Sequence, residues 1–287
     1  MALRLGITPL VVGLTIVAFG TSSPELFVST KASLLGQGSL ALGTVVGSNI
    51  CNILLILGVG CLIRPIKIHL QVLRVDLPIM VAASLLLAVM LWTGELTRVY
   101  GIGLIGAVLL YTGFTIRLSK RDAGKKDAEA FVPEGDKSEG PALWLVVLMV
   151  GGAILLVVGT DMILSGAVDL ATRLGVSQAV IGLTLIAVGG SLPELATTVS
   201  ASIGGNGDIA VGNIVGSNIF NILCVLGFAS VAHPIPVSGI ELADVLVMLG
   251  VSVMIVPLMK SGFSLKRWEG AVMLLLYAVY VASLAVR

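Results

Sequence analysis

Long apolar stretches, separated by short polar segments, dominate the chain. A helix that crosses a bilayer needs about 20 mainly apolar residues. Stretches of this length recur along the whole sequence, so we expect an all-α polytopic membrane protein. The pattern predicts nine transmembrane helices, at 8–30, 39–61, 74–92, 98–117, 142–170, 178–201, 208–230, 242–259 and 268–286.

One polar segment is much longer than the others. It covers Ser119–Gly140, between the fourth and fifth predicted helices, and mixes basic with acidic residues. We interpret it as a solvated linker that holds no folded domain. The chain is thereby divided into a first repeat at 1–117, a linker at 118–140 and a second repeat at 141–287.

Both repeats carry the same motifs, 169 positions apart. Residues 13–26 (GLTIVAFGTSSPEL) match residues 182–195 (GLTLIAVGGSLPEL) at 9 of 14 positions. Residues 43–58 (GTVVGSNICNILLILG) match residues 212–227 (GNIVGSNIFNILCVLG) at 11 of 16 positions. The offset holds without a gap, and it predicts two structurally equivalent halves.

The two halves are expected to be inverted relative to one another. An odd number of crossings separates the first predicted helix from its copy, so the copies cross the membrane in opposite directions. Inverted repeats with a midplane site between them are the plan of many secondary transporters.

Loop charge predicts the orientation. With the linker in the cytoplasm, 13 of the 17 Lys and Arg residues fall on the cytoplasmic side, as the positive-inside rule requires. The N-terminus is then cytoplasmic and the C-terminus external. We expect a multi-pass protein of a bacterial or archaeal plasma membrane.

Composition agrees with this class. Only 11% of the residues are charged, the mean hydropathy is +1.09 and the net charge is +1. Such a balance argues against nucleic acid as a partner, since nucleic-acid-binding proteins present a basic face. The three cysteines fit no metal or redox spacing, and we interpret them as packing residues.

Two carboxylates lie inside the apolar stretches, Glu25 and Glu194, at equivalent positions. A charged side chain at the bilayer centre costs about 3 kcal/mol on insertion scales. No Lys or Arg lies nearby in either stretch, so a bound cation is the expected partner. A protonated, structural Glu is the alternative for each.

Prolines directly precede both carboxylates. Pro24 and Pro193 lack an N–H group and clash with the preceding turn. Together with the nearby glycines they are expected to break each helix at mid-membrane, where broken helices are tolerated only if they line a cavity. A simple proline kink is the alternative.

Hydroxyl and amide groups surround these positions. Asn49 and Asn218 face away from the Ser/Asn pairs of the second and seventh helices, and interhelical hydrogen bonding is the favoured interpretation for them. Asp76 and Asp244 begin two predicted helices and are expected at the membrane interface. Asp161 lies within the fifth helix, with either an ion-path or a packing role. The candidate ligands besides the two carboxylates are Thr21, Ser22, Ser191, Ser48, Ser217, Asn52 and Asn221.

This candidate set contains only oxygen ligands. Hard cations favour oxygen, and Ca²⁺ takes about 6–8 such ligands in flexible geometry. One Ca²⁺ neutralises two carboxylates, and several Na⁺ or protons do so in turn. Mutual exclusion between these ions gives a physical basis for exchange.

The paired motifs resemble the alpha repeats of the sodium/calcium exchanger family, within the wider cation/calcium antiporters, in its prokaryotic form. The resemblance covers nearly the whole chain and implies a fold of ten helices in two inverted halves. It implies that Glu25 and Glu194 bind Ca²⁺ and share Na⁺. It also implies ion-binding roles for the seven hydroxyl and amide residues above, with carbonyls near Ala18 and Ala187.

Three departures from the family pattern are expected to matter. The family's first helix has no counterpart here, since the fifth predicted helix lacks a partner in the first half. Gly190 replaces the usual Thr, which removes one sodium ligand. Both Asn52 and Asn221 are amides, which favours potassium-independent Na⁺/Ca²⁺ exchange.

The expected function is therefore a secondary antiporter of Ca²⁺ and Na⁺, not an enzyme, with no cofactor. A Ca²⁺/H⁺ antiporter and a truncated, inactive paralogue remain alternatives. An intramembrane hydrolase using two acids that share a proton is a third, and the ring of Ser, Thr and Asn ligands argues against it. The sequence does not predict the oligomeric state.

Overall fold

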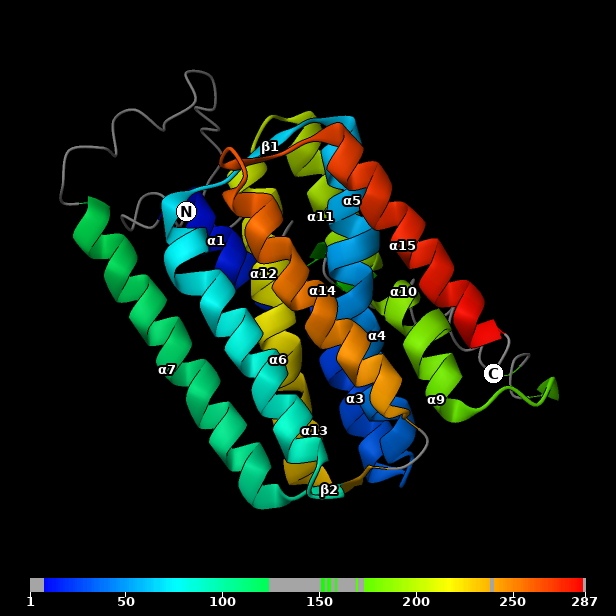
Figure 1. The fold of residues 1–287 in the computed structure, drawn as a ribbon. Helices are drawn as coiled ribbons and strands as arrows, with labels where there is room; N and C mark the ends of the chain where they lie inside the picture. The colour runs from blue at the N-terminus through cyan, green and yellow to red at the C-terminus, as the bar shows by residue number, and fades with distance from the viewer. Residues whose placement is uncertain are drawn as a thin grey trace.

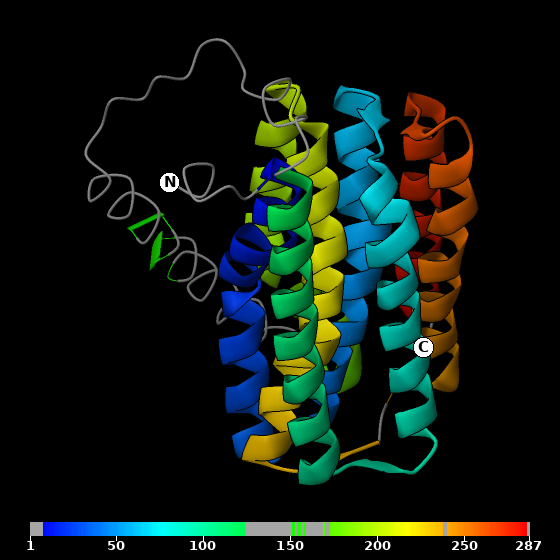
Figure 2. The ribbon, with the colours of Figure 1, turned by 90° about the vertical axis from the view of Figure 1, so that its left-hand side faces the viewer.

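The fold is a bundle of helices that run roughly along one common direction (Figures 1 and 2). The computed structural model describes residues 8–123, 151–152, 154–155, 158, 169, 173–237 and 240–285. The elements of the first half are α1 (Pro9–Val12), η2 (Gly13–Val17), α2 (Ala18–Thr21), α3 (Ser23–Leu34), α4 (Gly38–Cys51), η3 (Asn52–Ile56), α5 (Leu57–Ile63), β1 (Ile66–Lys67), η4 (Val72–Asp76), α6 (Leu77–Leu91), β2 (Glu95–Leu96) and α7 (Arg98–Ala123). Those of the second half are α9 (Gln178–Ile181), η6 (Gly182–Ile186), α10 (Ala187–Gly190), α11 (Leu192–Ile203), α12 (Gly207–Phe220), η7 (Asn221–Val225), α13 (Leu226–Ala232), β3 (Ile235–Pro236), α14 (Leu242–Lys260), β4 (Ser264–Leu265) and α15 (Arg267–Ala285).

Six of the described helices are long and apolar enough to cross a membrane, and two bent pairs reach the same length when each is taken as one helix. The bent pairs are Pro9–Thr21 with Ser23–Leu34 and Gly182–Gly190 with Leu192–Ile203. Each of these eight corresponds to one predicted helix. The predicted helix at 142–170, with Asp161, lies almost wholly outside the described residues.

Two continuous helices form the centre of the bundle, Gly38–Ile63 (α4, η3 and α5) and Gly207–Ala232 (α12, η7 and α13). Each contains a π-helical turn that starts at an asparagine, Asn52 or Asn221. The helices α6, α7, α14 and α15 pack around this pair and turn their other faces outward. The broken helices pack against the centre as well, α4 against η6 and α12 against η2.

Short strands connect the two halves at both ends of the bundle. β1 pairs antiparallel with β4, with Ile66 opposite Leu265, and β2 pairs antiparallel with β3, with Leu96 opposite Ile235. Figure 1 shows β1 at the top of the bundle and β2 at the bottom. Since β1 and β3 are equivalent in sequence, equivalent elements lie at opposite ends of the molecule.

The prediction of one gapless offset is wrong for α6 and α14. Asn49 contacts the sulfur of Met248, and its equivalent Asn218 contacts the sulfur of Met80, which sets the offset between these two methionines at 168. The π-helical turn η4, absent from α14, shifts the register in the first half. In the second half, Phe263, which has a φ of 52°, is one additional residue in the loop after α14, so the offset of 169 holds again from β4 onward.

Asp76 and Asp244 lie close to the beginning of their helices, as predicted. Their position at the membrane interface stays a prediction. Both side chains are buried. Asp76 accepts a hydrogen bond from the Tyr111 hydroxyl at 3.0 Å, and Asp244 accepts one from Tyr280 at 3.4 Å. A buried carboxylate with such a donor ties the start of one helix to the middle of a neighbour.

The fourth predicted helix is longer than expected. α7 continues to Ala123, beyond the predicted end at 117 and into the segment 118–140 that we interpret as a linker. The apolar pattern could not predict the end of α7, because the last turns of this helix carry polar and charged residues.

Candidate functional site

Both broken helices change direction at a serine. Ser22 has φ −80° and ψ 5°, and Ser191 has φ −85° and ψ 9°, so both leave the helical region in the same way. The two segments on either side are bent by 43° in the first half and by 48° in the second. A proline follows two residues later in each and removes a backbone donor. The predicted mid-helix breaks are confirmed.

The two carboxylates occupy the first turn of the helices that follow the breaks. Glu25 is the third residue of α3 and Glu194 the third residue of α11, and each side chain is 0% exposed. A helix N-terminus stabilises a nearby anion by about 0.3–1 kcal/mol, and somewhat more when partly buried. That is less than the cost of burying two carboxylates without a cation.

Hydroxyl groups link each carboxylate to the other half. Ser22 Oγ donates to Glu194 Oε1 and Ser191 Oγ donates to Glu25 Oε1, both at 3.1 Å. Each break therefore contributes one carboxylate and one hydroxyl that binds the opposite carboxylate. The two acids face one another across the boundary between the halves.

The central helices approach this pair closely at two glycines. A Cβ atom on Gly47 would lie 2.5 Å from the Leu183 carbonyl oxygen, and one on Gly216 would lie 2.6 Å from that of Leu14. Only glycine fits such a contact between backbones. The next residue in each helix then reaches the site.

Those next residues are Ser48 and Ser217. Ser217 Oγ donates to Glu194 Oε1 at 3.1 Å, and Ser48 Oγ lies 3.5 Å from the Ala187 carbonyl oxygen. The Ala18 carbonyl has the equivalent place in the first half, where it accepts from Thr21 Oγ1 at 3.2 Å. The structure thus brings these hydroxyls and carbonyls together around the carboxylates.

Four asparagines form a crossed arrangement between the central helices. Asn52 Nδ2 donates to Asn218 Oδ1 at 3.0 Å, and Asn221 Nδ2 donates to Asn49 Oδ1 at 3.2 Å. The predicted interhelical bonding of Asn49 and Asn218 is confirmed. These bonds engage the amide nitrogens of Asn52 and Asn221 and leave both amide oxygens without a hydrogen bond from the described residues.

Four buried oxygen atoms of the site accept no hydrogen bond from the part of the chain that the structure describes. They are one carboxylate oxygen of each acid and the amide oxygens of two asparagines: Glu25 Oε2, Glu194 Oε2, Asn52 Oδ1 and Asn221 Oδ1. Buried polar atoms are normally paired. Four unpaired acceptors at equivalent positions of the two halves therefore fit a bound cation, because no described protein donor satisfies these oxygens.

The ligand chemistry is restricted to oxygen. Among the described residues no group of three or more His, Cys, Asp and Glu side chains lies close enough to hold a metal ion. Cys51, Cys61 and Cys224 are buried and unbridged, as expected of packing residues. Two carboxylates and neutral oxygens are a ligand set that suits Ca²⁺ and Na⁺ better than soft transition metals.

One residue of the site was missed in the sequence. Asn213 is buried, contacts Thr21 Oγ1 through Oδ1 at 3.1 Å and donates from Nδ2 to the Glu194 carbonyl at 3.5 Å. A signal was present, because Asn213 is a polar position where the two motif copies differ, Thr44 being its equivalent. The π-helical turns near the site also escaped prediction, since no sequence pattern marks them.

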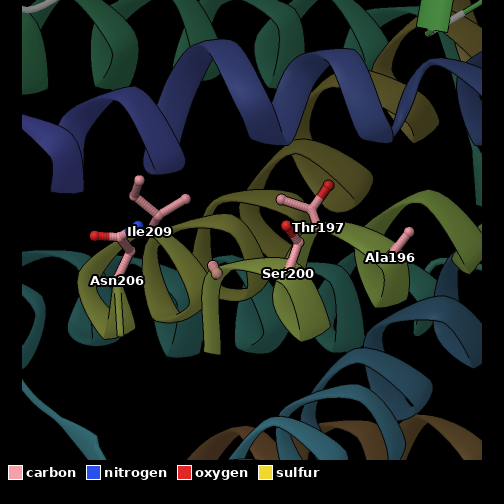
Figure 3. Close-up of a pocket in the computed structure, with 6 residues that line it drawn as sticks. Ala196, Thr197, Ser200, Asn206 and Ile209 are labelled. Carbon is pink, nitrogen blue, oxygen red and sulfur yellow. The ribbon is translucent and has the colours of Figure 1, made fainter. Parts of the chain in front are cut away.

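A separate pocket of about 420 Å³ lies on α11, on α12 and on the turn between them. Figure 3 shows its lining side chains, which include the hydroxyls of Thr197 and Ser200 and the amide of Asn206. Neither carboxylate lines it. The pocket is therefore distinct from the site around Glu25 and Glu194, whose carboxylates are fully buried.

Comparisons with known proteins point in one direction. Residues 1–117 and 144–286 match the family described as sodium/calcium exchanger protein. Inner membrane protein YrbG of Escherichia coli is 41% identical over 255 residues, which cover 86% of this chain and 77% of the relative. Sodium/calcium exchanger MaX1 of Methanosarcina acetivorans is 32% identical over 318 residues, which cover 99% and 91%.

A solved structure is similar over nearly the same range. The sodium-calcium exchanger NCX_Mj, soaked with Na⁺ and Sr²⁺, superposes with a TM-score of 0.79 at 29% identity, covering 98% of this chain and 89% of that one. The same exchanger soaked with Na⁺ and Ca²⁺ gives a TM-score of 0.78. Fold and sequence comparisons therefore agree.

Proposed function

The chain belongs to the sodium/calcium exchanger family, and on this basis we propose that it exchanges Ca²⁺ for Na⁺ across a membrane by alternating access. The single observation that carries the proposal is the pair of fully buried carboxylates, Glu25 and Glu194, each with an oxygen that no described donor satisfies. Two such charges need a counter-charge inside the membrane.

The proposed ligands are the residues that surround this pair. Ca²⁺ binds between the two carboxylates and the unpaired amide oxygens, and its two charges neutralise both acids. Na⁺ binds to the same carboxylates together with hydroxyl and carbonyl oxygens. Because both ions need the same carboxylates, one cargo displaces the other. The full set is Glu25, Glu194, Thr21, Ser22, Ser191, Ser48, Ser217, Asn52, Asn221 and the carbonyls of Ala18 and Ala187.

We further propose that the two halves are inverted repeats in a plasma membrane, with the β1–β4 end in the cytoplasm. The placement of equivalent strands at opposite ends supports inversion. Arg64, Lys67, Lys266 and Arg267 flank or lie in the β1–β4 pair, and basic residues favour the cytoplasmic side. The breaks at Ser22 and Ser191 interrupt helices that together are long enough to cross a membrane, and this supports a site near the midplane, where inverted-repeat transporters bind their cargo.

The test is ion flux through the full chain reconstituted in vesicles. Vesicles loaded with Na⁺ and diluted into Na⁺-free medium should take up ⁴⁵Ca²⁺, and uptake should stop when the Na⁺ gradient is removed. Uptake that follows a pH gradient and ignores Na⁺ would favour Ca²⁺/H⁺ exchange. An absence of any driven Ca²⁺ flux would favour an inactive paralogue.

The site assignment has its own test. Glu25→Gln and Glu194→Gln keep the shape of the side chain and remove the charge, so each should abolish exchange without preventing insertion. Glu95→Gln is the matched control, because Glu95 is exposed at the start of β2. Undiminished Ca²⁺ flux in both site variants would remove these carboxylates from the mechanism.

A further inference from the structure

Basic residues gather around the β1–β4 pair, at the end of the bundle that Figure 1 shows at the top. We call this group the basic rim. All of its side chains are exposed, and none of them takes part in an ion pair among the described residues. The first half contributes two members and the second half three: Arg64, Lys67, Lys260, Lys266 and Arg267.

Contacts between the halves hold the two arginines of the rim in place. Arg267 donates from Nη2 to the Ile63 carbonyl oxygen at 3.3 Å, so its guanidinium group lies beside the backbone next to Arg64. The Arg64 guanidinium group covers the turn between α11 and α12, where a Cβ atom on Gly205 would lie 2.5 Å from Arg64 Nη1. Two guanidinium groups are therefore positioned at this end without a carboxylate partner among the described residues.

Two acids at the same end are turned inward. Glu269 is buried, and its Oε2 atom accepts a hydrogen bond from the Lys266 backbone N–H at 2.6 Å. Asp76 is buried as well and accepts from the Tyr111 hydroxyl. Neither acid forms a described ion pair with an exposed cation. Like charges that lie this close repel one another, so the rim favours an anion from outside the protein.

The opposite end of the bundle lacks this charge. β2 and β3 pair in the same way as β1 and β4, but only Arg267 has a Lys or Arg as its equivalent, Arg98. The other four rim residues have His233, Pro236, Trp92 and Thr97 as their equivalents. Because the same strand pairing forms without these cations, the sheet does not need them. Basic loops also direct insertion, but that role does not require them to gather in the folded protein.

Two exposed aromatic side chains accompany the cations. Trp268 follows Arg267 directly and is 59% exposed, and Phe263, in the loop before β4, is 51% exposed. Phe263 has a φ of 52°, a conformation that costs a bulky residue energy, and its carbonyl accepts from the Ile68 N–H at 2.8 Å. Exposed aromatic rings are typical of the level of the lipid headgroups. The rim and these rings together have the chemistry of a surface for anionic lipid.

We propose that the basic rim binds the headgroups of anionic phospholipids and that these headgroups link the two halves at the β1–β4 end. The arginines bind the phosphate through paired N–H groups, and the lysines add charge. Trp268 and Phe263 contact the lipid just below the headgroup. The inference goes beyond ion exchange and concerns a surface outside the carboxylate site. In the orientation proposed above, these lipids belong to the cytoplasmic leaflet.

The test measures which lipids lie beside Trp268. In the full chain with Trp92→Phe and Trp144→Phe, Trp268 is the single tryptophan. Quenching of its fluorescence by brominated phosphatidylglycerol or brominated phosphatidylcholine in vesicles gives the relative affinity of the two lipids. Phosphatidylglycerol should bind more tightly, and added inorganic phosphate should not displace it. Removal of one rim charge should lower this relative affinity about fivefold, the contribution of one basic residue near an anionic surface.

Lys67→Gln and Arg267→Gln are the test variants, and Arg98→Gln is the matched control at the position equivalent to Arg267. Arg98→Gln should leave the lipid preference unchanged. Lys67 lies at an exposed strand position, so its variant keeps the test decisive if loss of the bond from Arg267 to Ile63 disturbs folding.

Three results would each overturn the inference: no preference for phosphatidylglycerol, equal losses in Arg98→Gln and Arg267→Gln, or displacement of the lipid by inorganic phosphate. The measurement needs no ion flux. A chain that prefers phosphatidylglycerol but does not exchange Ca²⁺ would support the lipid surface and contradict the proposed exchange, so the two failures are distinguishable.

Discussion

The central helices and the outer helices of this bundle are similarly apolar, but the central ones are buried in the protein and the outer ones are largely exposed. In the most apolar windows of Gly38–Ile63 and Gly207–Ala232, 78% and 89% of the residues are buried in the protein. In those of Arg98–Ser119 and Arg267–Leu284 the shares are 28% and 33%. All four are apolar enough to cross a bilayer, so apolarity alone does not tell a central helix from an outer one.

What separates the two classes is where glycine and the polar residues lie. The central helices direct Ser48 and Ser217 at the broken helices, join one another through Asn52 and Asn218, and use Gly47 and Gly216 to approach the broken helices. The outer helices turn leucines outward. Lipid is as apolar as leucine, so packing and polar contacts, not burial of apolar surface, decide which helix is central.

The largest expected effect comes from closing the gap at a central glycine. Gly216→Ala puts a methyl group 2.6 Å from a backbone oxygen that cannot swing away. Overpacking of this kind costs about 1–3 kcal/mol or more. The Tm of the purified protein in detergent should fall by about 5 °C or more, as followed by fluorescence or size-exclusion chromatography after heating.

Gly103 provides the matched control for that substitution. It lies in the outer helix α7, and a Cβ atom there meets nothing within 4 Å. Gly103→Ala should leave the Tm unchanged or raise it slightly, since alanine favours helix. If both glycine variants lowered the Tm equally, close packing would not distinguish the central helices.

A smaller effect is expected from the asparagines that hold the ligands. Asn218→Ala removes the oxygen that Asn52 Nδ2 binds, so the Asn52 amide is no longer held in one orientation. Ca²⁺ affinity should fall roughly tenfold, the scale seen when groups that orient metal ligands are lost. Equilibrium ⁴⁵Ca²⁺ binding to the purified protein measures it.

Ser84→Ala is the control for a buried polar contact without a role in the site. Ser84 lies 3.3 Å from Ser252, between α6 and α14. Its loss should leave Ca²⁺ affinity unchanged. A similar drop in both variants would assign the effect of Asn218→Ala to general loosening of the bundle.

The smallest effect is expected on the outer face. Leu109 and Leu110 of α7 are 68% and 77% exposed, so truncation to Ala should change neither ⁴⁵Ca²⁺ uptake nor the Tm by more than about 1 °C, as expected away from packed features. Leu104→Ala in the same helix should be costly, because Leu104 is 1% exposed and loss of a buried leucine costs about 2–5 kcal/mol. Equal effects at the three leucines would mean that Leu109 and Leu110 are packed like Leu104 and not exposed on an outer face.

Much of the fold followed from the sequence, because length and apolarity set transmembrane helices directly. The repeats and the breaks at Ser22 and Ser191 were also predictable, since proline and glycine act locally. The register of α6 against α14 was not. A π-helical turn adds one residue without changing composition, and a later loop residue compensates for it, so the motifs on either side still align at one offset.

The residues of the candidate site were likewise predictable from the sequence only in part. The residues with charge or amide groups, such as Glu25 and Asn52, stand out because burying them in lipid is expensive. Asn213 was missed because its place depends on how far α12 rotates toward the first broken helix. The burial of Asp76 and Asp244 was missed for a similar reason, since their tyrosine donors lie on helices far along the chain.

The crossed packing of the halves has a consequence for biogenesis. Each central helix rests on the broken helix of the other half, and each terminal strand pair draws one strand from either half. A nascent chain that has inserted only its first half therefore holds Gly47 against no partner and β1 without β4. These contacts cannot form before the second half has been inserted, so the first half is expected to reach its final packing only late in synthesis.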